Sequence, residues 1–68
     1  MNATFTVIIQ REENWYVASC LENHVASQGT TIDEAVQNLK EALALYYEED
    51  HELPERLPIF VTTVEVAF

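Results

Sequence analysis

The sequence predicts an α+β fold in which three strands are followed by one helix and a fourth strand. Three observations favour this fold: runs rich in β-branched and aromatic residues before position 28, apolar residues at helical spacing after position 31, and another β-rich run over 59–68. With 68 residues, the chain is long enough for one domain only. We therefore expect the order β-β-β-α-β within a single domain covering residues 1–68.

The first 28 residues are expected to form three antiparallel strands. Residues 3–11 contain the run FTVIIQR and residues 15–21 are the run WYVASCL, both of which suit a pleated, half-buried surface. The short polar segment between these runs predicts a hairpin turn. A third, shorter strand is predicted over 24–28, after which Gly29 would supply the backbone freedom to leave the sheet.

Residues 32–49 are predicted to form an amphipathic helix. Thr31 and Glu34 have the spacing of a capping box, in which each side chain satisfies a free amide at the start of a helix. The following apolar residues recur at intervals of three and four and form one stripe. The members of this stripe, with Leu39 near its middle, are Ile32, Ala35, Val36, Leu39, Ala42, Leu43 and Tyr46.

A last strand is predicted over 59–68, after a linker that contains Pro54 and Pro58. A right-handed crossover through the helix would place this strand beside the first strand and parallel to it. The expected architecture is a four-stranded mixed sheet, ordered 3-2-1-4, with one helix packed on one face.

The opposite face of this sheet is expected to carry apolar side chains as well. Ile8, Trp15 and Val17 alternate with the residues that would face the helix. An uncovered apolar face predicts self-association into a dimer or a larger homo-oligomer. The alternative is a bare face, because many antiparallel sheets tolerate some exposed apolar residues.

The charge balance argues against binding to nucleic acid. Three Lys and Arg residues stand against twelve Asp and Glu residues, which gives a formal net charge of -9. Phosphate backbones are bound by clustered cations, whereas Arg11, Lys40 and Arg56 are few and scattered. We expect a basic protein as the partner, since an acidic chain attracts cationic surfaces.

No pattern in the sequence predicts a catalytic, cofactor or metal site. Cys20 is the single cysteine, His24 and His51 lie far apart, and Gly29 alone cannot form a phosphate-binding loop. We therefore expect a protein that is not an enzyme and has no cofactor. No run approaches the ~18 apolar residues of a membrane span, and no basic signal-peptide region precedes the first strand, which predicts a cytoplasmic location.

The most charged segment spans the end of the predicted helix and the residues after it. Carboxylates near a helix C-terminus oppose the helix dipole and repel one another. Contact with a cationic surface would relieve this repulsion, whereas the alternative is a solvated helix end that aids solubility. The residues predicted to bind a partner are these carboxylates and two aromatic anchors: Trp15, Tyr47, Glu48, Glu49, Asp50, Glu52 and Glu55.

Three stretches of the chain resemble a known family. Residues 16–21 (YVASCL), 27–35 (SQGTTIDEA) and 38–46 (NLKEALALY) are similar to the N-terminal domain of HicB-like antitoxins. The resemblance implies a partial ribonuclease H-like fold and a non-catalytic antitoxin, usually oligomeric, from a type II toxin-antitoxin system. Its implied partner is a small basic toxin ribonuclease of the HicA type.

The chain departs from this family in two places. Full-length HicB-like antitoxins carry a C-terminal domain that binds operator DNA, whereas this chain ends at Phe68, so we expect no DNA-binding domain in it. Family members often have a longer segment with Pro and Gly where this chain has Glu22, Asn23 and His24. If toxin contacts use that loop, the identity of the toxin is open.

Two alternatives stand beside the antitoxin interpretation. A nuclease of the ribonuclease H type would need a carboxylate in the middle of the first strand to hold Mg²⁺, and residues 4–10 contain none. An orphan oligomeric adaptor or structural module would have the same fold and no toxin partner. A small basic protein encoded beside this chain would favour the antitoxin over the adaptor.

Overall fold

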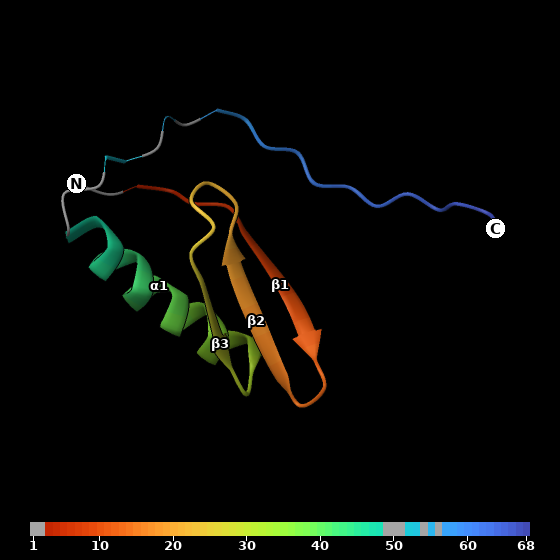
Figure 1. Ribbon diagram of the computed structural model, residues 1–68, viewed down its shortest axis with the longest axis horizontal. Helices are drawn as coiled ribbons and strands as arrows, with labels where there is room; N and C mark the ends of the chain where they lie inside the picture. The colour runs from red at the N-terminus through yellow and green to blue at the C-terminus, as the bar shows by residue number, and fades with distance from the viewer. Residues whose placement is uncertain (1–2, 49–51, 54, 56) are drawn as a thin grey trace.

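The computed structural model describes residues 3–48, 52–53, 55 and 57–68 (Figure 1). In these residues, β1 (Val7–Glu12), β2 (Trp15–Cys20) and β3 (Ala26–Gly29) form an antiparallel sheet in the order β1-β2-β3. The helix α1 (Ile32–Glu48) follows β3. The structure thus confirms the first four predicted elements, although β1 begins at Val7 and not at residue 3.

The prediction of a fourth strand is wrong. Residues 59–68, here called the C-terminal arm, run as an extended segment away from the packed part of the chain (Figure 1). The sheet of the described residues is therefore three-stranded and antiparallel, and not a mixed sheet ordered 3-2-1-4. A β-rich sequence becomes a strand only where a neighbouring strand and a buried face are present, and the arm has neither in this structure.

The strand register separates the two faces of the sheet. Val7 lies opposite Cys20 and Ile9 lies opposite Ala18, so these four side chains share one face. Trp15 and Val17 occupy alternate positions of β2 and point to the other face, as the sequence pattern predicted.

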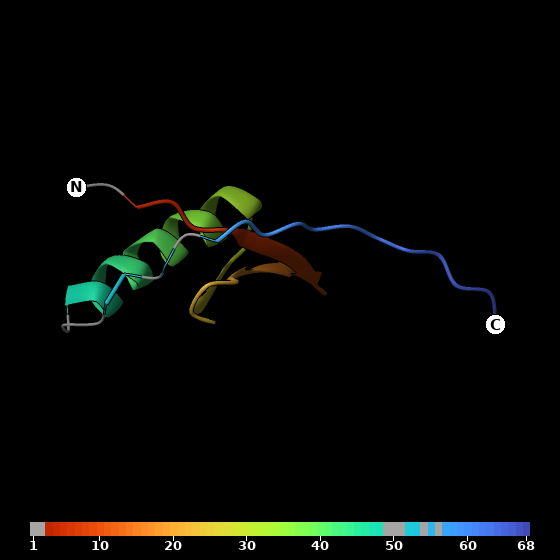
Figure 2. The same ribbon diagram turned by 90° about the horizontal axis from the view of Figure 1, so that it is seen from above.

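The core lies between α1 and the first of these faces. Its buried members are Ala18, Cys20, Ala35, Leu39 and Leu43. Figure 2 shows α1 along one side of the sheet only, which confirms the predicted single helical layer. Because α1 packs mainly on β3 and β2, β1 lies at the margin of the core, and Ile9 is 38% exposed although it belongs to the covered face.

Two hydrogen bonds begin α1 in the manner of a capping box. The Glu34 amide donates to Thr31 Oγ1 at 3.0 Å. The Glu34 carboxylate accepts a bond from the Thr30 amide at 2.9 Å, one residue earlier than the standard motif. The predicted start of the helix is confirmed, and the two bonds tie the end of β3 to the first turn of α1.

Gly29 is required for a different reason from the one predicted. Its φ is not positive, so the backbone needs no left-handed conformation there. A Cβ at this position would lie 2.5 Å from the Ala35 amide nitrogen and 2.8 Å from the Cβ of Glu34. Gly29 therefore allows β3 to approach the first turn of α1 closely.

Candidate partner-binding surface

The C-terminal half of α1 exposes an apolar residue between carboxylates on its outer side. Leu45 is 62% exposed and lines an open hollow of about 420 Å³ together with Glu41, Ala44 and Glu48. These positions are three, four and seven residues apart, which places them on one side of a helix, away from Leu39 in the core. We call this set, Glu41, Ala44, Leu45 and Glu48, the acidic helix surface.

An apolar cleft adjoins this surface. Ala44 lines both the hollow and the cleft, so the two are adjacent. The cleft has a volume of about 420 Å³ and lies where the start of the chain and Leu53 meet the helix. It is lined by Ala3, Phe5, Lys40, Leu43, Ala44, Tyr47 and Leu53. A partner that buries Leu45 could extend an apolar side chain into this cleft.

Tyr47, one of the predicted aromatic anchors, is a half-buried wall of the cleft. Its ring stacks on Phe5 with the centroids 5.5 Å apart and makes an edge contact with Tyr46 at 4.9 Å. Its hydroxyl accepts a hydrogen bond of 2.7 Å from Asn23 Nδ2. Asn23 also accepts a bond from the Val25 amide at 3.0 Å, so Tyr47 joins the end of α1 to the turn between β2 and β3. These contacts hold the ring in place.

Trp15, the other predicted anchor, lies far from Tyr47. It begins β2 at the turn from β1, is 47% exposed and points away from the helix. The next residue, Tyr16, pairs with Gly29 near the start of α1, whereas Tyr47 lies at the end of this helix. A helix of 17 residues is about 25 Å long, so the structure does not bring the two aromatic residues into one site.

The predicted carboxylates are only partly described by the structure. Glu48, Glu52 and Glu55 are exposed, and Glu48 is the last residue of α1. Glu49 and Asp50 lie outside the described residues.

Sequence reasoning missed Glu41 and Leu45. The signal for them was present, because Leu45 is a large apolar residue that falls outside the apolar stripe of the helix. A leucine off the stripe and between two carboxylates indicates an exposed apolar position with acidic neighbours.

The thiol of Cys20 is buried and hydrogen-bonded to Glu22. Burial raises the pKa of Cys20, which keeps it protonated, and Cys20 Sγ donates to Glu22 Oε1 at 3.4 Å. Burial by itself would also raise the pKa of Glu22, but hydrogen bonds from Thr6 and Cys20 together lower it below its usual value. The Thr6 amide donates to the same Oε1 at 2.8 Å. The hydrogen bonds that Glu22 accepts from Thr6 and Cys20 therefore stabilise the N-terminal side of the sheet.

The described residues hold neither a cluster of metal ligands nor a membrane-spanning helix. Within 3–48 and the later described positions, no three His, Cys, Asp or Glu side chains gather closely enough to hold a metal ion. No helix in this part of the chain has both the length and the apolar composition needed to cross a bilayer.

Comparison with known proteins identifies the family of the chain. A model described as a family of unknown function (DUF7387) matches residues 3–57, which is most of the chain. The chain belongs to this family. The DUF7387 match spans the sheet and α1 and ends at Leu57, before the C-terminal arm. No curated protein and no solved structure matches the chain. The resemblance to HicB-like antitoxins therefore stays a prediction.

Proposed function

We propose that this DUF7387 protein is a non-catalytic binding protein of the antitoxin type. Its partner is a small basic toxin ribonuclease, which docks on the acidic helix surface and is neutralised by occlusion. This function places both proteins in the cytoplasm, where the toxin would meet RNA. The observation that carries the proposal is the exposure of Leu45 between Glu41 and Glu48.

The chemistry of this surface suits a cationic protein better than an anionic one. Leu45 and the adjoining cleft offer apolar area at the centre of an interface, where binding energy is concentrated. Glu41 and Glu48 lie at its rim, where charges accelerate encounter and select the partner. The last turn of α1 contains no basic residue, so a cation from the partner would stabilise the negative end of the helix dipole.

A binding measurement with two charge-matched variants tests this proposal. The probe is the small basic protein encoded next to this chain, titrated by calorimetry at low and high salt. Neutralising the surface with Glu41→Gln and Glu48→Gln should weaken binding several-fold, since each exposed pair contributes ~0.2–1 kcal/mol. The control, Glu12→Gln with Glu13→Gln in and beside β1, removes the same charge far from the surface and should change affinity little. Equal losses in both variants would show that net charge alone acts.

A growth assay tests the biological half of the proposal. Co-expression with this chain should restore growth to cells that make the basic neighbour, and Leu45→Ser should reduce that rescue. If the neighbouring frame encodes no small basic protein, or if co-expression leaves toxicity unchanged, the antitoxin function is refuted.

An assembly module without a toxin is the second candidate function. The exposed apolar side chains of the C-terminal arm favour it, because a monomer gains nothing from presenting them to water. A stable homo-oligomer with no bound basic protein would select this function over the first.

A further inference from the structure

The β1 edge of the sheet is open. The Leu21 amide donates to the Thr6 carbonyl oxygen at 2.9 Å, so Thr6 directs its carbonyl toward β2. Backbone direction alternates along an antiparallel strand, and therefore Val7, Ile9 and Arg11 direct their N–H and C=O groups away from β2. Among the described residues β1 pairs with β2 alone, so these groups form a ladder that can accept another strand.

This edge lacks the usual protection against pairing. Exposed edges are commonly guarded by Lys, Pro or a bulge, which prevent another chain from adding to the sheet. Residues 3–10 contain neither a charge nor a proline, and the first charged residue of β1 is Arg11. An edge of this kind favours strand addition.

The C-terminal arm has the properties of a strand without a partner. Phe60 is 91% exposed and Val64 is 82% exposed, and Glu65 is the one charged residue of the arm. Figures 1 and 2 both show the arm running away from the sheet, so that its end lies far from the core of its own chain. The molecule is 46 Å long as a result, although its thickness is only 16 Å.

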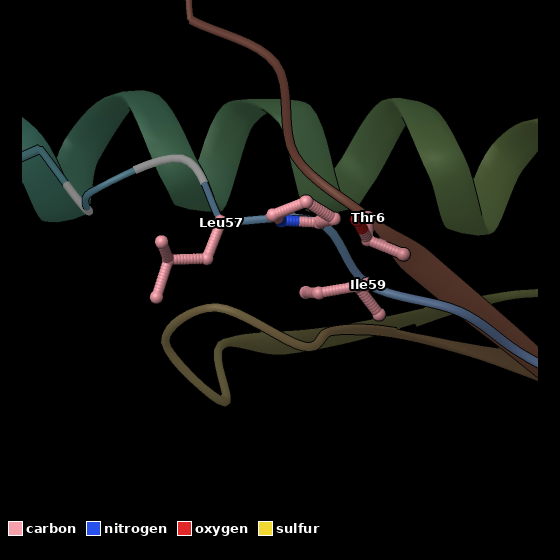
Figure 3. Close-up of a pocket in the computed structure, with 4 residues that line it drawn as sticks. Thr6, Leu57 and Ile59 are labelled. Carbon is pink, nitrogen blue, oxygen red and sulfur yellow. The ribbon is translucent and has the colours of Figure 1, made fainter.

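The base of the arm lies at the start of β1. Thr6, Leu57, Pro58 and Ile59 line a hollow of about 290 Å³ there, and Figure 3 shows the arm passing Thr6 as it leaves the body. Pro58 fixes its own φ and restricts Leu57 to extended conformations. From this point the arm extends past Thr6 and away from the packed body (Figures 1 and 3).

We propose that the arm of one copy pairs with the open edge of β1 in a second copy, and that the exchange is reciprocal. Both complementary parts, an unguarded edge and an unpaired β-rich segment, belong to the same chain, so a two-fold symmetric dimer uses each of them twice. Two chains of charge -9 repel each other, but this contact joins segments of low charge: Glu65 is the one charged residue of the arm, and Arg11 is the one charged residue among Val7, Ile9 and Arg11 of the open edge. Each chain keeps its own three-stranded sheet, and toxin binding is not required.

Mass measurement with matched variants tests the exchange. Light scattering should give the full chain the molar mass of a dimer, twice 7.8 kDa. Val64→Asp places a charge in the arm and should raise the dimer dissociation constant roughly tenfold or more. Leu45→Asp adds the same charge at an exposed apolar position of α1 and should leave the dimer intact. A monomeric wild type at high concentration, or equal dissociation of the two variants, would overturn the proposal.

A mixed-label measurement identifies which segments meet. Unlabelled chain carrying a nitroxide at Thr63→Cys, in which Cys20 is buried, is mixed with ¹⁵N-labelled wild-type chain. The amide signals of Val7, Ile9 and Arg11 should broaden in the labelled copy. Reciprocal exchange would be refuted if these signals broaden only when the nitroxide and the ¹⁵N label are in the same chain. It would also be refuted if only the signals of other residues broaden. The label lies outside the packed body, so the fold is preserved, and the result is independent of any toxin.

Discussion

Strand β2 of the packed body and the C-terminal arm are both rich in β-branched and aromatic residues, yet they have different structures. Residues 15–20 (WYVASC) form β2, with two buried side chains. Residues 59–64 (IFVTTV) are at least as rich in β-branched and aromatic residues, yet they form no strand in this chain. The difference is context: β2 has a strand on each side and a helix over one face, whereas the arm extends away from the body. Local propensity therefore identifies a segment that can pair, while neighbours decide whether and with what it pairs.

The largest expected effect on stability comes from removing the buried side chain of Leu39 from the core of the packed body. This side chain is 1% exposed between α1 and the sheet, so Leu39→Ala would leave a cavity that a five-residue buried core cannot refill. We expect the free energy of unfolding to fall by about 2–5 kcal/mol, measured by urea denaturation. In a domain this small, such a loss can unfold most of the population.

The control for this prediction is the same substitution on the same helix. Leu45→Ala removes an exposed leucine and should change the free energy of unfolding by less than about 0.5 kcal/mol. If Leu39→Ala and Leu45→Ala lower the free energy of unfolding by similar amounts, burial does not determine how much each leucine contributes to stability.

The second prediction concerns the contact between β3 and α1. Gly29→Ala would bring a Cβ to 2.5 Å from the Ala35 amide nitrogen, and this neighbour is backbone that cannot move aside. We expect a loss of about 1–3 kcal/mol, measured by thermal unfolding, because the strand and the helix must separate. The folded variant should have the same oligomeric state as wild type, since Gly29 does not contact the arm that is proposed to form the dimer. Unchanged stability would show that the two elements can separate without loss.

The sequence was sufficient for the elements whose signals are local. The capping residues Thr31 and Glu34 and the apolar stripe around Leu39 identify α1, and the β-rich runs on either side of a short polar turn identify β1 and β2. The arm was predicted as a strand because its composition is that of one. The position of the arm depends on the direction in which the chain leaves Pro58, and no local sequence pattern predicts this direction.

The candidate site was predicted less completely than the fold. The acidic end of α1 was found because its charges are unfavourable there, and Glu48 does lie at the exposed end of the helix. Trp15 and Tyr47 were grouped by residue type, and only three-dimensional structure shows that they lie at opposite ends of α1. Leu45 was missed because the apolar stripe predicts only the residues of the helix that face the core, and Leu45 lies outside this stripe and is exposed.

A smaller effect is expected at the start of α1. Thr31→Val preserves the shape of the side chain and removes the oxygen that accepts the Glu34 amide hydrogen. We expect the free energy of unfolding to fall by about 1 kcal/mol, the usual contribution of a helix N-cap, measured by urea denaturation. Thr31→Ser retains the acceptor and should restore most of this loss. A Ser variant as unstable as the Val variant would indicate that the methyl group, and not the hydroxyl, matters.

The smallest effect is a pH dependence within the body. The pKa of Glu22 is lowered in the folded state below its usual 4.5, against the opposing effect of burial, because Thr6 and Cys20 donate hydrogen bonds to its carboxylate. Folding therefore favours the charged form, and the resulting stability is present at neutral pH and is lost as pH falls below 4.5 through the folded pKa. Glu22→Gln should flatten this part of the curve of unfolding free energy against pH. If Glu22→Gln keeps the full acid dependence, other carboxylates cause it and the bond to Thr6 does not stabilise the start of the sheet.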